Sequence, residues 1–261
     1  MRLGNNVAVI TGGASGMGKA ISLLFAKEGA TVAVADIDGA KAASVAQTIL
    51  ETGGAAVAIP VDVTKEQEVR ALVSVGLSRF NRIDILVNCA GIAEYIPAEE
   101  ISSDQWQRML NVDLSGIFYC CREVGREMIK RKRGKIINFS STAGLAGIPS
   151  MAHYCAAKHG VVGLTKALAV EWGKYNVNVN CICPGATLTP LLLGATTESH
   201  RNERARKVPL QRLATPEDQA QVALFLASSE SDYVSGGVLC VDGGIFALAA
   251  STSESAFRAE K

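Results

Sequence analysis

Tyr154 and Lys158 are the residues whose types and spacing most directly indicate chemistry. They lie at the start of a segment with helical periodicity, and residues four apart in a helix share one face. A free tyrosine has a pKa of about 10, but a cation within about 4–6 Å favours the phenolate. A phenol placed in this way can exchange a proton with a carbinol or a carbonyl. The alternative is an ordinary solvated helix face, where such pairs are common.

A glycine-rich turn follows the first apolar run of the chain and leads into a helical segment. Glycines there let the backbone approach a diphosphate, and the free amides at the start of the helix stabilise its charge. Similar turns exist that bind nothing, but a position between the first strand and helix of a βαβ unit favours a dinucleotide site. The predicted contacts are Gly12, Ser15, Gly16, Met17 and Gly18.

Asp36 ends the second apolar run, and 36 − 18 places it eighteen residues after Gly18. This is close to the spacing of about 20 residues at which an acid hydrogen-bonds an adenosine ribose. A carboxylate there repels a 2′-phosphate, and neither Ser15 nor Ile37 could neutralise that phosphate. NAD(H) is therefore expected rather than NADP(H). The alternative, in which Asp36 only caps a strand end, leaves the glycine-rich turn unexplained.

Seven apolar or β-branched runs alternate with helical segments, and these elements must position the residues above. The expected strands are 7–11, 31–36, 56–61, 84–88, 135–140, 177–183 and 238–242. The expected helices are 19–28, 40–51, 65–80, 104–133, 153–172 and 216–228. Right-handed crossovers then predict an α/β fold, a doubly wound (Rossmann) seven-stranded parallel sheet with helices on both faces. No linker interrupts the pattern, so residues 1–248 are expected to be one domain with both cofactor and substrate sites, followed by a flexible tail, 249–261.

The charge balance excludes several classes of partner. Lys and Arg number 26 against 25 Asp and Glu, so the net charge of +1 offers no broad field to nucleic acid or anionic lipid. The basic run 130–133 before Gly134 is interpreted as a helix end whose cations complement the helix dipole and which Gly134 terminates. The long uncharged stretches 136–157 and 175–197 contain Pro, Gly and Asn that argue against a membrane helix. A cytoplasmic protein with neither nucleic-acid nor membrane partners is expected.

The cysteines and histidines give no sign of a metal site. None of the seven cysteines forms a CxxC pair, and the three histidines lack the usual ligand spacing of a zinc site. The thiols are therefore predicted to be reduced and structural, and no metal is expected.

Together these motifs resemble the commonest branch of the short-chain dehydrogenase/reductases, from Val7 to about Gly244. The resemblance is carried by the TGGASGMG turn, by Asn88-Cys89-Ala90-Gly91, by Asn111, by the set Ser141, Tyr154 and Lys158, and by Pro184-Gly185. One departure is Cys89, where the family usually has a second Asn. This departure puts only local hydrogen bonding in doubt.

The resemblance implies a role for each matching residue. Ser141, thirteen residues before Tyr154, would hydrogen-bond the substrate oxygen, and Tyr154 would be the acid/base. Lys158 would hold the nicotinamide ribose and lower the tyrosine pKa, while Asn111 would anchor a water relay behind Lys158. Further cofactor contacts would be Asp62, Val63, Asn88, Ala90, Gly91, Pro184, Gly185, Thr187 and Thr189. The resemblance also implies a homotetramer built on segments 104–133 and 153–172.

The expected activity is hydride transfer between NAD(H) and an alcohol or carbonyl substrate, as in an NAD-dependent short-chain alcohol dehydrogenase acting on a secondary alcohol. One alternative is an NADPH-linked carbonyl reductase, such as a 3-oxoacyl thioester reductase. Another is a non-catalytic dinucleotide-sensing protein, which the complete Ser-Tyr-Lys set argues against.

Substrate selection is expected to depend on loops near the tyrosine and after Pro184-Gly185. The candidates are Glu94, Tyr95, Ala143, His153, Leu191 and Arg201. The cationic stretch 198–212 could be a lid that clamps an anionic substrate. A solvated amphipathic helix is the favoured interpretation of that stretch, and a packing role is the favoured interpretation of His153.

Overall fold

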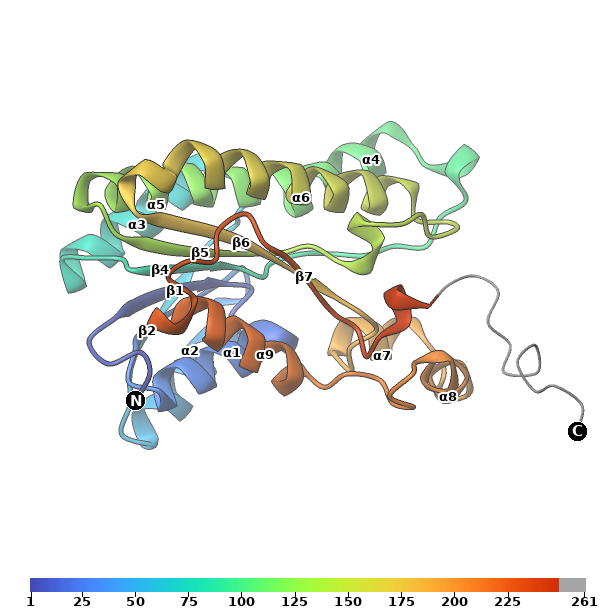
Figure 1. Ribbon diagram of the computed structural model, residues 1–261, viewed down its shortest axis with the longest axis horizontal. Helices are drawn as coiled ribbons and strands as arrows, with labels where there is room; N and C mark the ends of the chain where they lie inside the picture. Colours follow the sequence, from blue (N-terminus) through green and yellow to red (C-terminus); the bar gives the residue numbers. More distant parts are fainter. Residues whose placement is uncertain (249–261) are drawn as a thin grey trace, which may run out of the picture.

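Seven parallel strands form one sheet in the order β3-β2-β1-β4-β5-β6-β7 (Figure 1). The structure is a computed structural model that describes residues 1–248, so the predicted tail lies outside the described residues. The strands are β1 (Val7–Thr11), β2 (Thr31–Asp36), β3 (Ala55–Pro60), β4 (Ile85–Asn88), β5 (Gly134–Phe139), β6 (Val177–Pro184) and β7 (Val238–Val241). The predicted doubly wound sheet is confirmed. Its order reverses between β1 and β4, and in such sheets ligands bind at the carboxyl ends of the strands beside the reversal.

Helices cover both faces of this sheet, as Figure 1 shows. One layer contains α1 (Gly16–Lys27), α2 (Gly39–Glu51) and α9 (Pro216–Ala227), and the other contains α3 (Glu66–Phe80), α5 (Gly116–Arg131) and α6 (Ala152–Trp172). Neighbouring residues of β1 enter different cores, because successive side chains of a strand point to opposite faces: Val9 packs on the α3-α5-α6 side, and Ala8 and Ile10 pack on the other. This two-sided burial explains why the strands are apolar throughout.

The helix predicted at 104–133 is divided into three parts. It begins as α4 (Ser103–Leu110), passes through a π-helical turn (Asn111–Ser115) and continues as α5. In the π turn the amide of Gly116 donates to the carbonyl of Asn111, five residues earlier. Such turns often occur at functional sites. Here the turn contains Asp113, whose side chain is completely buried.

Two short helices, α7 (Pro190–Ala195) and α8 (Glu198–Lys207), lie beyond the carboxyl end of the sheet (Figure 1). No residue of α8 is buried, and its Lys207 pairs with Glu203 at 2.7 Å. This agrees with the favoured interpretation of the cationic stretch as a solvated helix. Among residues 1–248, no helix combines the length and apolarity that a membrane crossing requires.

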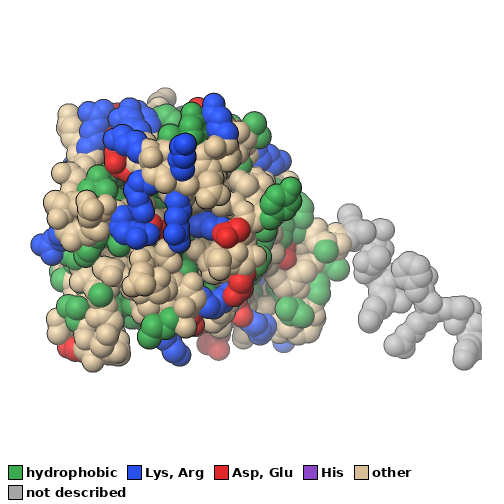
Figure 2. Space-filling model, turned by 60° about the vertical axis from the view of Figure 1, so that its left-hand side comes forward, with side chains coloured by type: hydrophobic (Ala, Val, Ile, Leu, Met, Phe, Trp, Pro, Cys, Tyr) green, Lys and Arg blue, Asp and Glu red, His purple; other side chains and the backbone are tan. Residues whose placement is uncertain are grey.

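Helix α5, which carries the basic run, ends at a different residue from the one predicted. The left-handed residue that ends the helix is Lys132, at φ 51°, and Gly134 instead begins β5. A Cβ at Gly134 would lie 2.3 Å from the Met128 Sδ atom, so a close contact with the core requires this glycine. Arg131 of the run pairs with the buried Asp84 at 3.1 Å. Figure 2, which brings the left-hand side of Figure 1 forward, shows Lys and Arg side chains gathered on this face.

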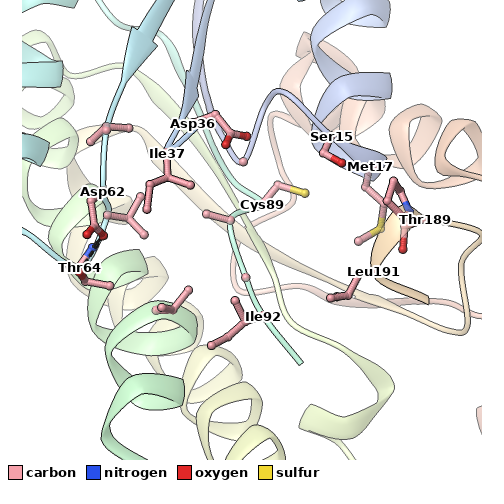
Figure 3. A pocket seen from close by; sticks show the side chains of 18 of the residues that line it. Ser15, Met17, Asp36, Ile37, Asp62, Thr64, Cys89, Ile92, Thr189 and Leu191 are labelled. Atoms are coloured by element: carbon pink, nitrogen blue, oxygen red, sulfur yellow. Dashed lines mark hydrogen bonds between the residues drawn. The ribbon is translucent and has the colours of Figure 1, made fainter. Parts of the chain in front are cut away.

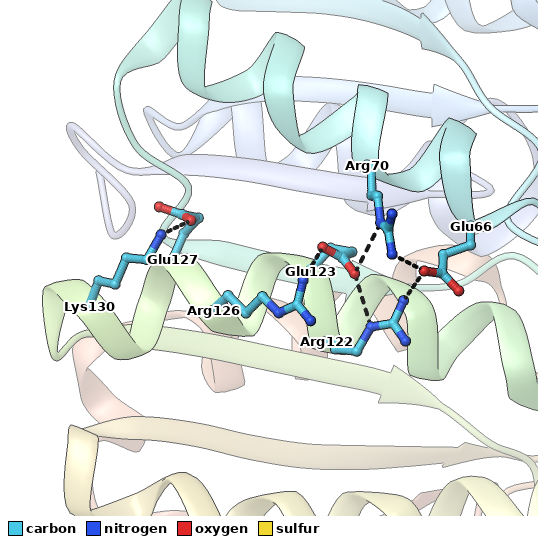
Figure 4. Close-up of polar contacts among 7 residues, drawn as sticks. All are labelled: Glu66, Arg70, Arg122, Glu123, Arg126, Glu127 and Lys130. Carbon is cyan, nitrogen blue, oxygen red and sulfur yellow. Dashed lines mark hydrogen bonds and ion pairs between the residues drawn. The ribbon is translucent and has the colours of Figure 1, made fainter.

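Ion pairs connect α3 to α5 on the outside of the sheet (Figure 4). Arg122 of α5 pairs with Glu66 of α3 at 2.7 Å and with the neighbouring Glu123 at 2.9 Å, and Arg70 of α3 contacts both carboxylates. The Arg70 side chain is 55% exposed, and pairs at such exposed sites contribute only about 0–1 kcal/mol each. The network therefore orients the two helices more than it stabilises the fold.

Candidate active site

A cavity of about 580 Å³ opens at the carboxyl ends of the central strands, beside the reversal of strand order. Figure 3 shows it elongated, with Asp62 and Thr64 at one end and Thr189 and Leu191 at the other. The predicted cofactor residues that line it are Gly12, Ser15, Gly16, Met17, Asp36, Asp62, Val63, Ala90, Gly91 and Thr189. The sequence did not single out Val61, Thr64, Ile92, Arg108, Val112 and Pro190, which line it too. In the sequence, these residues were marked only by following a predicted strand closely or by lying near a predicted site residue.

The glycine-rich turn is packed so tightly that two of its glycines admit no side chain. Gly12 has φ +63°, and a Cβ there would lie 2.8 Å from the Cα atom of Ala90. A Cβ at Gly18 would lie 2.0 Å from the carbonyl oxygen of Gly12. Gly18 does not line the cavity. Its missing side chain allows α1 to begin close behind the turn, so that the free amides at the start of the helix are directed at the cavity. This cradle and the elongated cavity fit a dinucleotide.

Asp36 both caps the end of β2 and lines the cavity. Its carboxylate accepts hydrogen bonds from the backbone amides of Ala14 and Asp38, each at 3.0 Å. The next residue, Ile37, is 74% exposed and also lines the cavity. The strand-end cap considered as an alternative is thus real, and it coexists with a carboxylate at the cavity wall (Figure 3).

Four other predicted cofactor residues do not line the cavity in this structure. Asn88 is buried and donates to Asn138 Oδ1 at 2.8 Å, so its amide is directed into the core. Thr187 is also buried and donates to the carbonyl of Gly185 at 3.0 Å. Pro184 is the last residue of β6, and the cavity lining includes neither it nor Gly185 or Thr187.

Two further lining residues have shifted pKa values. Cys89 stands where the family has Asn, and burial raises the pKa of its thiol to about 12, which keeps the thiol neutral. For Asp62, burial alone would raise the pKa of the carboxyl. Hydrogen bonds that the hydroxyl and amide of Thr64 donate outweigh burial, so the pKa is lowered and the residue is held as a carboxylate.

Ser141, Tyr154 and Lys158 lie together next to this cavity. Tyr154 and Lys158 share one face of α6, and the lysine Nζ lies 5.5 Å from the centroid of the tyrosine ring. The Ser141 hydroxyl is close enough to the phenol to lower its pKa, and it accepts from the amide of Ala143 at 3.1 Å. Its neighbour Ser140 instead donates to the carbonyl of Lys158 at 2.8 Å, tying β5 to α6. The two adjacent serines therefore have different partners.

Lys158 has a partner that the sequence did not indicate. Its Nζ lies 3.0 Å from Oδ2 of Asp113 and donates to the carbonyl of Phe139 at 3.1 Å. The other carboxylate oxygen accepts from the amide of Ile92 at 2.9 Å. The only signal was an acid two residues after Asn111 in an apolar segment, and the π turn that directs it inward could not be predicted. The Asn111 side chain itself accepts from Gln107 at 2.8 Å at an exposed site.

Burial and this carboxylate set the charge states of the group. Burial lowers the pKa of Lys158, but the Asp113 charge outweighs burial and the net direction is upward. The pKa of Asp113 is raised, chiefly by burial. Burial also raises the pKa of Tyr154, opposed by Lys158 and Ser141 and reinforced by Asp113. Lys158 lowers the tyrosine pKa, as expected, but burial outweighs this effect and the net direction in this structure is upward.

Gly91 separates the cavity from the lysine. A Cβ placed on Gly91 would lie 2.9 Å from Asp113 Oδ2 and 3.6 Å from Lys158 Nζ. Because Gly91 lines the cavity, the ammonium lies directly behind the cavity wall. The Tyr-Lys pair and the dinucleotide-sized cavity are therefore on the same side of the sheet.

The predicted substrate residues are not all placed to meet a substrate. Leu191 lines the cavity, and the half-exposed Tyr95 is close enough to raise the pKa of Tyr154. Ala143 and His153 have no exposed surface in this structure, so neither is placed here to touch a substrate, and the burial of His153 agrees with the packing role favoured above.

The two charged candidates are engaged within the protein. Glu94 pairs with Arg108 at 2.5 Å, at the rim of the cavity. Arg201 donates to the carbonyl of Thr196, which joins the end of α7 to α8. Neither charge is free in this structure to clamp an anion.

Comparisons with known proteins agree with this geometry. A family model described as enoyl-(acyl carrier protein) reductase matches residues 12–246. The 3-oxoacyl-(acyl-carrier-protein) reductase FabG of Chlamydia trachomatis is 42% identical over 242 residues, which are 92% of this chain and 97% of that protein. The D-threitol dehydrogenase of Mycolicibacterium smegmatis is 39% identical over 243 residues, with coverages of 93% and 94%.

A solved structure extends the comparison to the fold and the cofactor. It is described as a candidate NAD(P)-dependent gluconate 5-dehydrogenase from Beutenbergia cavernae with NADP bound at low occupancy. Its TM-score is 0.90 at 38% identity, and the match covers 94% of this chain and 98% of that chain. Sequence and fold therefore agree along nearly the whole length.

Proposed function

We propose that this chain is an NAD-dependent dehydrogenase of a secondary alcohol. It belongs to the short-chain dehydrogenase/reductase family of oxidoreductases, which act on alcohols and carbonyls. The observation that carries the proposal is the position of the Lys158 ammonium directly behind Gly91, which lines a cavity shaped for a dinucleotide, with the ring of Tyr154 5.5 Å from that ammonium. A non-catalytic dinucleotide-sensing protein would not need this arrangement.

Each residue of the group has a defined task in this proposal. When bound, the nicotinamide supplies the hydride acceptor. Tyr154 accepts the proton of the carbinol, and the Ser141 hydroxyl holds the substrate oxygen beside the phenol. Lys158 stabilises the phenolate and, from behind Gly91, would hold the ribose of the bound cofactor. The reverse reaction uses the same groups, with Tyr154 donating its proton to the carbonyl.

NAD(H) is the proposed cofactor because of the wall formed by Asp36 and Ile37. An anionic carboxylate at the adenosine end disfavours a 2′-phosphate, and Ile37 offers it no compensating charge. The NADP in the Beutenbergia cavernae protein makes this the point of the proposal that most needs a direct test.

The second candidate function is NADPH-linked reduction of a 3-oxoacyl thioester. The observation that favours it is the 42% identity with the Chlamydia trachomatis reductase. Cofactor preference separates the two candidates, because the proposed dehydrogenase requires NAD⁺ and the reductase requires NADPH.

The proposal also includes the assembly and location of the enzyme. We infer one catalytic domain, residues 1–248, in a cytoplasmic homotetramer built on α5 and α6. Support comes from exposed apolar side chains on those helices, Phe118 at 39% and Val170 at 86% exposure. Light scattering coupled to size-exclusion chromatography tests the assembly, and a monomer at micromolar concentration would contradict it.

The decisive experiment measures NADH formation over a panel of secondary alcohols, sugars, hydroxysteroids, hydroxy acids and sulfonated polyols, before and after Tyr154→Phe. The substitution should remove nearly all turnover, because it removes the hydroxyl that accepts the carbinol proton in this proposal, while NADH binding stays measurable by fluorescence. An unchanged rate would exclude Tyr154 as the acid/base.

A further inference from the structure

Asp113 is a buried carboxylate that the proposed reaction does not use. It is completely buried, and it lies 3.0 Å from the equally buried ammonium of Lys158. An uncompensated charge in such a place is costly, so both groups depend on each other and on their hydrogen bonds. A carboxylate kept at this cost next to a catalytic lysine needs an explanation.

Three independent contacts fix the position of Asp113. The π turn directs its side chain inward, and the amide of Ile92 holds one oxygen at 2.9 Å. Gly91 lies against the other oxygen so closely that a Cβ would come within 2.9 Å of it. The carboxylate is thus immobilised between the cavity wall and Lys158.

We propose that Asp113 is a positioning residue, which holds the Lys158 ammonium behind Gly91 and takes part of its electrostatic effect away from Tyr154. The inference rests on the proposed function, because it assigns a purpose to the lysine only if Tyr154 is the acid/base. The inference concerns the pKa of the Tyr154 phenol and makes no statement about which substrate is bound.

The charged surroundings make Asp113 the dominant anion in this group. Lys158 is faced by Tyr154 on its own helix, by Asp113 from the π turn, by Cys89 after β4, and by Cys181 and Cys183 on β6. His153 faces Asp113, and Tyr95 faces Tyr154. Burial keeps the thiol of Cys89 neutral, while Cys181 and Cys183 shift each other's pKa in opposite directions, that of Cys181 upward and that of Cys183 downward. Removing the Asp113 charge should therefore direct the full field of the ammonium at the phenol.

The test is the ionisation of Tyr154 in the protein without added cofactor, for wild type, Asp113→Ser and Asp113→Asn. Phenolate absorbance is followed against pH, and the Tyr154→Phe version of each protein is subtracted. Both variants remove the charge. Serine keeps an oxygen that can accept from the Ile92 amide. Asparagine instead places an N–H group against either that amide or the Lys158 ammonium, which could impair folding. The serine variant therefore keeps the test informative if the asparagine variant fails to fold. We expect the midpoint to move to lower pH by on the order of one unit.

Asp84→Asn is the matched control, because Asp84 is an equally buried carboxylate in ion pairs at the opposite end of β4. It should leave the Tyr154 midpoint unchanged. If both Asp113 variants bind NADH and their midpoint stays at the wild-type value or rises, the proposal is overturned.

The titration needs no turnover, so it also separates this inference from the proposed function. If the wild type oxidises no alcohol but the Tyr154 midpoint still shifts in the Asp113 variants, the proposed function is refuted and the inference about Asp113 is not. Where turnover is found, the acid limb of the kcat profile should shift in the same direction as the titration. A lower kcat with an unshifted limb would reduce Asp113 to a structural residue and overturn the proposal.

Discussion

Asp36→Ala is the substitution that most directly tests how the cavity selects its cofactor. The wild-type carboxylate lines the adenosine end of the cavity and accepts from the amides of Ala14 and Asp38. Alanine removes the charge and leaves both amides at a partly exposed site, where water can replace the carboxylate. The glycine-rich turn should therefore keep its shape.

The expected magnitude follows from Coulomb's law. A 2′-phosphate carries a charge of about −1.5 to −2, and each unit charge about 5 Å from a carboxylate costs roughly 0.8–3 kcal/mol between the dielectric limits of water and a protein surface. Salt screening favours the lower part of this range, so repulsion by Asp36 should disfavour NADP(H) by about 1.5–3 kcal/mol, or roughly 10- to 150-fold. Asp36→Ala should recover most of that factor for NADPH. It should also weaken NADH binding, because the ribose hydroxyls lose their acceptor.

The assay is calorimetric titration of NADH and NADPH into wild type, Asp36→Ala and the control Asp38→Ala. Asp38 carries a neighbouring carboxylate that does not line the cavity and pairs with Lys41 at 2.7 Å, so its removal should change the NADH to NADPH ratio little. A ratio that stays the same in Asp36→Ala as in wild type would refute the electrostatic reasoning. A wild-type preference for NADPH would refute the assignment of NAD.

Three further predictions concern the same architecture. Gly18→Ala should lower the free energy of unfolding by about 1–3 kcal/mol and weaken NADH binding, because its Cβ meets the Gly12 carbonyl; thermal unfolding and calorimetry would show a tolerant turn if neither changes. Burial raises the pKa of Asp84, but ion pairs with two arginines outweigh it and the net direction is downward. Asp84→Asn should therefore destabilise the protein by about 1–3 kcal/mol at pH 7, and the difference from wild type in urea unfolding should shrink as pH falls through the lowered pKa; a difference independent of pH would contradict the ion-pair explanation. Arg204→Ala combined with Arg206→Ala should leave KM for an anionic substrate unchanged, since α8 buries nothing, and a large rise in KM would restore the anion clamp.

The fold could be predicted closely because its signals are local. Apolar runs and turn residues placed β1 and β2 within their observed bounds, and the other strands differ by a residue at one or both ends. Two errors came from packing contacts that the local sequence pattern does not reveal. Gly134 is a glycine because Met128 fills the space beside it, and the segment 104–133 is interrupted because Asp113 must reach Lys158.

The sequence by itself determined the chemistry that the chain carries. The spacing of Tyr154 and Lys158, the glycine-rich turn and Asp36 predicted a dinucleotide beside an acid/base, because each signal depends on residues close together in the chain. Only the tertiary structure decided which groups surround that acid/base. Asp113 reaches Lys158, Ala143 and His153 are completely buried, and the pKa of Tyr154 is raised. The physical reason is that burial and charge at a side chain are set by every element packed against it, and those elements come from distant parts of the chain.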